Sequence, residues 1–317
     1  MSAIIDIIVP VFGTVAVGWV LGRTLLTGEG LRGLTQVAFY SLFPALLFRS
    51  MAKVRLEALE PDIIVVFFGT GLLLYFLLMP LGRALGMKLG DQSVFALSGT
   101  FSNGVGIGIP FITYAFGEAG LVPLLMIISV NSLIMLTLCS FLLESGSGGG
   151  GGRLLAKLGG AALMMMKHPV IPSIFAGLAW AELTSWVPSL AIPVVIDKVL
   201  HALALAAPPC GLIMAGASLA HVGLKEHWQP AAVATAVKLA VVPLMVWAAG
   251  RYLFTLDPLW LTVATLNAAL PAGANVYLVA QLYRTSVGLA TNAVVISTGA
   301  SVFTLSVVLL LLGVQTR

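Results

Sequence analysis

The chain has 317 residues, of which 59% are hydrophobic and 9% are charged, and its mean hydropathy is +1.07. A soluble domain carries about 25% charged residues, so this composition excludes an ordinary soluble protein and indicates one that lies in a lipid bilayer. The formal net charge of +4 comes without a basic stripe interleaved with aromatic residues, so nucleic acid is not an expected partner.

Long apolar runs, separated by charged or glycine- and proline-rich breaks, predict ten transmembrane helices. A helix needs about 20 apolar residues to cross a bilayer, and these runs are continuous, as helices require, rather than alternating. The first run lacks a basic leader, so we expect it to be a membrane helix and not a signal peptide. The predicted spans are 4–22, 32–50, 62–82, 92–116, 120–143, 168–186, 197–221, 230–252, 258–282 and 287–313.

A glycine-rich stretch, SGSGGGGG at 145–152, falls between the fifth and sixth spans. Such a sequence behaves as a flexible coil, so we predict a linker at 145–166 between residues 1–144 and residues 167–317. Five spans on each side would insert the second half upside down relative to the first.

Matching residues recur in order in the two halves, which favours an internal repeat. The pairs include Pro10 with Pro172, Pro61 with Pro230 and Asp91 with Asp257, at separations of 162 to 169 residues. The predicted fold is therefore an all-α polytopic membrane protein built from two inverted five-helix repeats.

Lys and Arg residues in the predicted loops indicate the orientation. Nine of them fall in the loops after spans 1, 3, 5, 7 and 9, and six fall on the opposite side. Because cytoplasmic loops carry the excess of these residues, we predict a cytoplasmic linker and both termini outside.

The fourth and ninth spans each contain residues that interrupt a helix. Residues 102–110 read SNGVGIGIP, and residues 267–275 read NAALPAGAN. Proline removes a backbone donor, and each glycine costs about 1 kcal/mol relative to alanine. Interruptions at matching places in two repeats predict a transporter's binding site, because the freed amides suit an anion and the freed carbonyls a cation. The alternative is that these residues only kink the helices or let them pack closely.

Lys238 lies within the eighth predicted span, where a charge is costly and is by default a functional hypothesis. It would attract an organic anion or stand in for a coupling cation; alternatively, its long stem reaches the membrane interface. Arg49 and Glu118 lie near span ends, and we expect them to be interfacial. The histidines are too scattered to predict a metal site.

The sequence resembles the auxin efflux carrier family, which includes bacterial carriers of organic acids such as malonate. The stretches that carry the resemblance are 8–12, 43–48, 103–110 and 270–272 with Asn275. The resemblance implies the fold of sodium–bile acid symporters, with a scaffold of spans 1, 2, 6 and 7, often dimeric, and a mobile transport domain of spans 3–5 and 8–10. Spans 4 and 9 would be broken helices that cross around Pro110 and Pro271, in the plasma membrane of a bacterium (the inner membrane).

The function predicted on these grounds is secondary active transport of a small organic anion, a dicarboxylate such as malonate or an auxin-like carboxylate, by elevator-type alternating access. The alternative is a membrane sensor that binds a ligand at the same crossing without moving it. We expect neither enzymatic activity nor a cofactor. Coupling to Na⁺, coupling to H⁺ and uniport remain alternatives. The expected partners are the organic anion, the bilayer and a second copy of the chain. The candidate substrate-binding residues are Asn103, Gly106, Gly108, Pro110, Asn267, Pro271, Gly273, Asn275 and Lys238.

Overall fold

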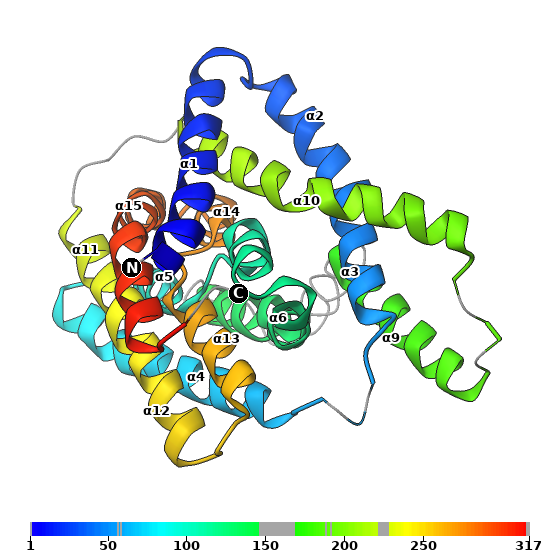
Figure 1. The fold of residues 1–317 in the computed structure, drawn as a ribbon. Coiled ribbons are helices and arrows are strands. Elements are labelled where there is room, and N and C mark those ends of the chain that lie inside the picture. The colour runs from blue at the N-terminus through cyan, green and yellow to red at the C-terminus, as the bar shows by residue number, and fades with distance from the viewer. Residues whose placement is uncertain are drawn as a thin grey trace.

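A computed structural model describes residues 2–55, 57, 59–145, 169–187, 189–190, 192–220 and 228–314. These residues form helices and their connections, without a strand among them (Figure 1). Apart from Ser145, the linker predicted at 145–166 lies outside the described residues. The first-half elements, with η for a π-helical stretch, are α1 (Ser2–Thr24), α2 (Glu29–Val37), η1 (Ala38–Leu42), α3 (Phe43–Met51), α4 (Asp62–Ala84), α5 (Leu89–Thr100), η3 (Gly104–Gly108), α6 (Ile109–Asn131), η4 (Ser132–Leu136) and α7 (Thr137–Ser145).

The second half also combines long helices with short ones. Its elements are α9 (Val170–Trp186), α10 (Val194–Ala220), α11 (Gln229–Ala236), η5 (Val237–Val241), α12 (Val242–Tyr252), α13 (Pro258–Ala269), α14 (Ala274–Leu282) and α15 (Val287–Leu311).

Within the described residues, seven helical stretches are long and apolar enough to cross a membrane. The predicted spans 92–116 and 258–282 are not among these seven stretches, because a non-helical segment divides each of them. Helix α9, with 17 residues, is shorter than each of the seven. The all-helical membrane class is confirmed, and the count of ten stays a prediction. The seven stretches are Asp6–Thr24, Glu29–Met51, Asp62–Ala84, Gly104–Glu144, Val194–Ala220, Gln229–Tyr252 and Val287–Leu311.

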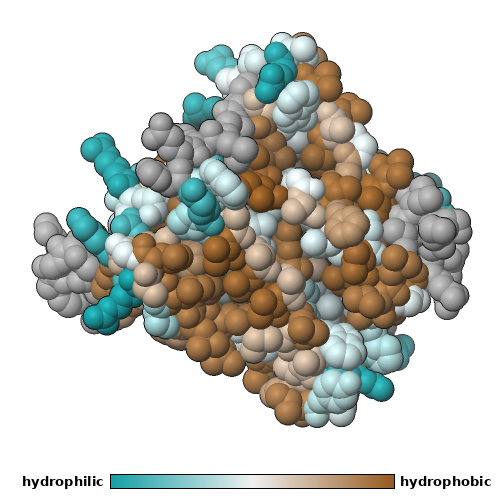
Figure 2. Space-filling model, turned by 90° about the vertical axis from the view of Figure 1, so that its left-hand side faces the viewer, coloured by the Kyte–Doolittle hydropathy of each residue, from teal (hydrophilic) through white to brown (hydrophobic). Residues whose placement is uncertain are grey.

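The outer surface is apolar over wide areas, as expected for helices that face lipid. Figure 2 shows hydrophobic side chains across the middle of one face and hydrophilic ones toward its margins. Large apolar side chains such as Leu244, Phe303 and Leu311 are mostly exposed. In water such a surface would be costly, whereas in a bilayer lipid tails cover it.

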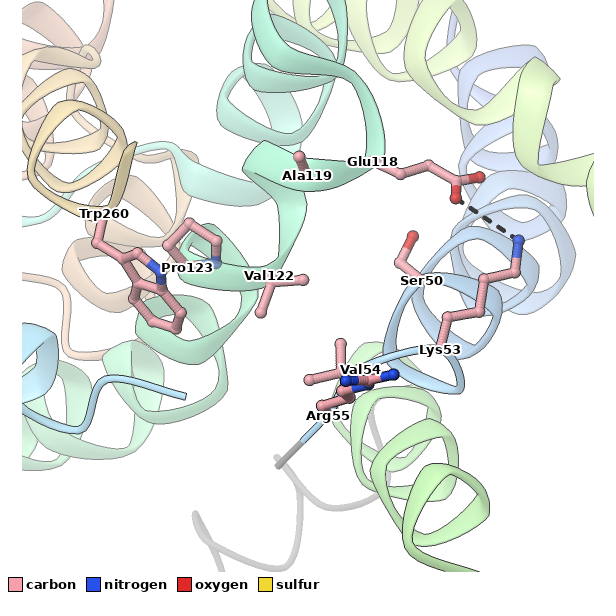
Figure 3. A pocket seen from close by; sticks show the side chains of 9 residues that line it. All are labelled: Ser50, Lys53, Val54, Arg55, Glu118, Ala119, Val122, Pro123 and Trp260. Atoms are coloured by element: carbon pink, nitrogen blue, oxygen red, sulfur yellow. Dashed lines mark ion pairs between the residues drawn. The ribbon is translucent and has the colours of Figure 1, made fainter. Parts of the chain in front are cut away.

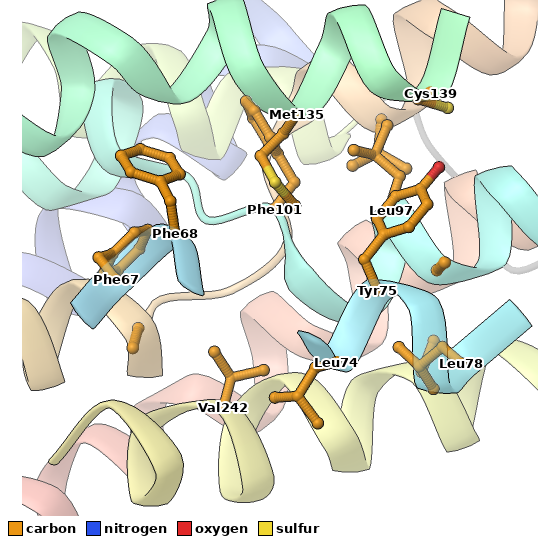
Figure 4. Close-up of a cluster of buried hydrophobic side chains, with 14 of the residues drawn as sticks. Phe67, Phe68, Leu74, Tyr75, Leu78, Leu97, Phe101, Met135, Cys139 and Val242 are labelled. Atoms are coloured by element: carbon orange, nitrogen blue, oxygen red, sulfur yellow. The ribbon is translucent and has the colours of Figure 1, made fainter. Parts of the chain in front are cut away.

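The buried side chains fall into two clusters. The first joins α4, α5 and α7 to α11–α15, and Figure 4 shows Tyr75 of α4 packed there near Cys139, with Phe101 beside Met135. The second joins α1, α3, α9 and α10 to η3 and α6. Residues of α13 and α15 contribute to both clusters, so the two cores meet at these helices.

Helix α1 crosses the C-terminal part of α10 in Figure 1, and the two helices pack directly against each other. A Cβ on Gly216 would lie 1.9 Å from the carbonyl oxygen of Val15, and one on Gly18 would lie 2.3 Å from that of Ile213. Small residues at a seam let membrane helices approach closely and gain dispersion contacts.

Candidate functional site at the paired segments

Two short non-helical segments, one between α5 and η3 and the other between α13 and α14, lie antiparallel in the interior. The backbone N–H of Asn103 donates to the carbonyl oxygen of Pro271 over 2.9 Å, and the N–H of Gly273 donates to that of Phe101 over 3.1 Å. These bonds satisfy groups that would otherwise be orphaned where a helix stops. We call residues 101–103 and 270–273 the paired segments.

The first interruption lies at the N-terminal end of the motif 102–110 that the sequence predicted to interrupt the helix. The motif around Gly106–Pro110 was expected to break the helix, but Gly106 and Gly108 lie in η3 and Pro110 is the second residue of α6. The carbonyl oxygen of Asn103 accepts from the N–H groups of both Ile107 (3.2 Å) and Gly108 (2.9 Å). A π-helical turn holds one extra residue per hydrogen bond, and this wider turn precedes the proline.

Asn103 caps the N-terminus of this helical stretch. Its side-chain Oδ1 accepts from the backbone N–H of Gly106 over 3.1 Å, which is the bond of an N-cap residue. A Cβ on Gly106 would lie 2.7 Å from the same oxygen, so only glycine leaves room for the cap.

The glycines of the two motifs let the segments meet. A Cβ on Gly108 would lie 2.7 Å from Cδ1 of Leu270, and one on Gly273 would lie 2.8 Å from the ring of Phe101. Each glycine therefore makes space for the opposite half of the chain, which a sequence motif alone does not reveal.

Asn267 is a deeply buried polar candidate, with 1% of its surface exposed. Its Oδ1 has no hydrogen-bond partner among the described residues. This oxygen lies 3.2 Å from the place that a Cβ would take on Gly104 and 3.5 Å from the corresponding place on Gly108, so it faces the motif of the first half. Asn275 is half-buried at the second position of α14. A buried orphan oxygen costs free energy unless a ligand or water satisfies it.

Lys238 does not extend to the surface of the protein. Its side chain is fully buried, and Nζ donates a short hydrogen bond to the carbonyl oxygen of Ala268 in the last turn of α13. The carbonyls at a helix C-terminus carry partial negative charge, and a cation there is favourable. The ammonium thus lies at the end of the helix that leads into the second paired segment.

Arg49, predicted to be interfacial, lies in the last turn of α3 and is buried. Arg49 is 9% exposed and forms ion pairs with Glu118 and Asp197, which come from α6 and α10. The available signal was its position inside the apolar run 43–51, but its two partners could not be identified from sequence because they are remote along the chain.

These observations define a class before any relative is considered: a membrane protein whose interior joins two interrupted helices around buried polar groups, as carriers do. A family model described as "Membrane transport protein" matches residues 3–150 and 155–309, so the chain belongs to that family. Over 315 residues the chain is 27% identical to a protein of Rhizobium meliloti (strain 1021) named "Putative malonate transporter", and the alignment covers 98% of this chain and 97% of that protein. The family inferred from the sequence motifs is confirmed, and the chain is an integral membrane transporter.

Proposed function

We propose that this transporter carries a small organic anion, a dicarboxylate such as malonate or an auxin-like carboxylate, through a site at the paired segments. The observation that carries the proposal is the juxtaposition of Asn103, the unpartnered oxygen of Asn267 and the ammonium of Lys238 around two interrupted helices. The helices that start after these segments present N-terminal amides, which attract anions. The name of the Rhizobium relative supports the choice of malonate.

The proposed topology is ten spans in two inverted repeats, in which α5 with η3–α6 and α13 with α14 are the broken crossing helices. Polar contacts between loops support it, because each joins groups that this topology puts on the same side. Asp91 accepts from Thr285 and Ser286 at 2.9 and 2.6 Å on the side proposed as cytoplasmic. On the opposite side, proposed to hold the termini, a carboxylate oxygen of Glu60 accepts from the backbone N–H of Asp257 at 3.3 Å.

Alternating access is proposed to move spans 3–5 and 8–10 against a scaffold of spans 1, 2, 6 and 7, which dimerises. The division of the buried side chains supports this partition in part: the first cluster holds most of the proposed moving helices, and the second contains α1, α3, α9 and α10. The contact between the two bodies is close. A Cβ on Gly211 of α10 would lie 3.4 Å from Cγ of Pro110 and 3.5 Å from the carbonyl oxygen of Gly106.

Lys238 is proposed to act as a fixed counter-charge. Its contact with the carbonyl of Ala268 supports the alternative in which it stands where a coupling cation would bind, rather than at the interface. A cation there would favour uniport over sodium coupling, while attracting the anion electrostatically.

The experiment is uptake of labelled malonate by proteoliposomes that contain the purified chain, with sodium and pH gradients imposed separately. Saturable uptake, and counterflow when unlabelled malonate is inside, is the expected result. Pro271→Ala and Asn103→Ala should abolish uptake while leaving the protein in the membrane, because both residues shape the paired segments.

Wild-type uptake by both variants would contradict a substrate-binding site at the paired segments. Binding of carboxylates without counterflow of any of them would favour the sensor function over transport.

A further inference from the structure

A cluster of ion pairs surrounds Arg49 at the end of α3, away from the paired segments. The guanidinium donates from Nε to Oδ1 of Asp197 over 2.8 Å and from Nη2 to Oδ2 over 3.4 Å. Nη1 donates in another direction, to Oε1 of Glu118 over 2.5 Å. The Arg49 side chain is 10% exposed. A guanidinium this deeply buried is stable only while carboxylates or other acceptors satisfy its donors.

Two cations converge on the carboxylate of Glu118. While Arg49 binds Oε1, Nζ of Lys53 lies 3.6 Å from Oε2. Each oxygen of this carboxylate therefore faces a positive charge, which is how a protein binds the carboxylate of a small acid. Glu118 shows where such a group fits.

A pocket with a volume of about 330 Å³ opens beside this carboxylate (Figure 3). Its wall includes Ser50, Lys53 and Arg55 on one side and Trp260 of α13 on the other. The volume is at the small end of the range for ligand pockets, about 300–1,000 Å³, and it suits a short organic acid. In Figure 3, Glu118 extends from α6 across the pocket toward Lys53.

The two carboxylate partners of Arg49 are not equivalent. Asp197 binds two of the guanidinium nitrogens and its side chain is 36% exposed, whereas Glu118 binds one and is 52% exposed. Glu118 also follows Gly117, whose φ of 62° and ψ of −149° interrupt α6 in a conformation that glycine alone adopts readily. Asp197 therefore positions Arg49, and Glu118 is the partner that can leave.

We infer that this pocket is a second carboxylate-binding site, in which a small carboxylic acid displaces Glu118 from Arg49 and Lys53. Arg55 and Ser50 supply further donors for the other end of a dicarboxylate. One wall of the pocket comes from α6 and α13, which also lead to the paired segments. The choice of malonate as the ligand rests on the proposed function, whereas the site itself rests on the geometry of the cluster.

The test measures protection of Lys53 from an amine-acylating reagent, using mass spectrometry of the purified full-length chain with malonate as the probe. Glu118→Gln should lower the malonate concentration for half-protection by about fivefold or more, because it removes a half-exposed carboxylate that competes for the same cations. The matched control is Glu182→Gln, at the end of α9, whose carboxylate accepts from Trp186 and has no contact with Arg49. This control should behave as the wild type.

Equal half-protection of the wild type and Glu118→Gln would overturn the inference, and so would equal protection by inorganic phosphate and malonate. Uptake measured on the same preparations separates the two proposals. Wild-type uptake without protection of Lys53 would reject this site and leave the proposed function intact. Protection of Lys53 without uptake would support this site and reject the proposed function.

Discussion

The two paired segments have similar backbones but different side-chain chemistry. Helices α5 and α13 each have 12 residues, and each is followed by a short non-helical segment and another helix. The first half contributes glycines and the cap of Asn103, whereas the second half contributes the buried amide of Asn267 and the contact with Lys238. Two similar backbone segments would thus supply different parts of the proposed site.

The position in the first half that the predicted repeat matches to Lys238 has a different side chain. The separation of 168 residues that relates Arg83 to Arg251 places Thr70 opposite Lys238. The hydroxyl of Thr70 donates to the carbonyl of Val66 in its own helix over 2.7 Å. The first half therefore satisfies this position locally, and only the second half has a cation there.

Of the changes that test this asymmetry, removing that cation is expected to have the largest effect. Lys238→Met should lower the rate of malonate uptake in proteoliposomes by about 10- to 100-fold, since hydrogen bonds to charged groups contribute about 1.5–3 kcal/mol. Thr70→Val is the matched control in the other half, and its uptake should stay within about twofold of the wild type because its hydrogen bond is local. Equal losses in the two variants would contradict the asymmetry.

A smaller effect is expected from filling the space between the segments. Gly273→Ala should lower the free energy of unfolding by about 1–3 kcal/mol, because its Cβ would meet the buried ring of Phe101 and the carbonyl oxygen of Ser102. Gly108→Ala should cost less, since its Cβ would meet the movable end of Leu270. Thermal unfolding in detergent measures both. Gly299→Ala, with open space around its Cβ, is the control, and a loss there as large as in Gly273→Ala would refute the steric argument.

The smallest effect is expected at Asn267, where stability and malonate affinity should change in opposite directions. Asn267→Leu should raise the melting temperature, because it removes an unsatisfied buried oxygen. It should also weaken malonate binding by about fivefold, the loss of one net hydrogen bond of about 1 kcal/mol. Calorimetric titration of the purified protein measures the affinity, and Thr265→Val, whose hydroxyl bonds its own helix at 2.7 Å, is the control. A rise in stability with unchanged affinity would remove Asn267 from the binding site.

Several helices could be predicted nearly to the residue. The span predicted at 62–82 corresponds to α4 (Asp62–Ala84). The span predicted at 197–221 corresponds to α10 (Val194–Ala220). The position of the first interruption was harder to predict. Glycine and proline are poor helix formers in isolation, but the π-helical turn and the Asn103 cap keep Gly106–Pro110 helical and move the interruption to residues 101–103.

The side-chain partners show where local patterns stop being informative. Arg49 pairs with Glu118 and Asp197, which lie 69 and 148 residues away, and Lys238 bonds a carbonyl 30 residues away. Hydropathy depends only on neighbouring residues, so it identified the apolar runs and suggested that charges near their ends face water. It contains no information on which distant group satisfies a buried charge.

The sequence by itself determined that the chain is an all-helical membrane protein and that two of its apolar runs contain an interruption, because bilayer insertion and helix propensity act on contiguous residues. Only the tertiary structure decided that the two interrupted regions pair with each other, that Lys238 is bound at the end of α13, and that Arg49 is buried between two carboxylates. The physical reason is that a buried polar group must find its partner in space, and the packing of the helices determines which groups come within reach.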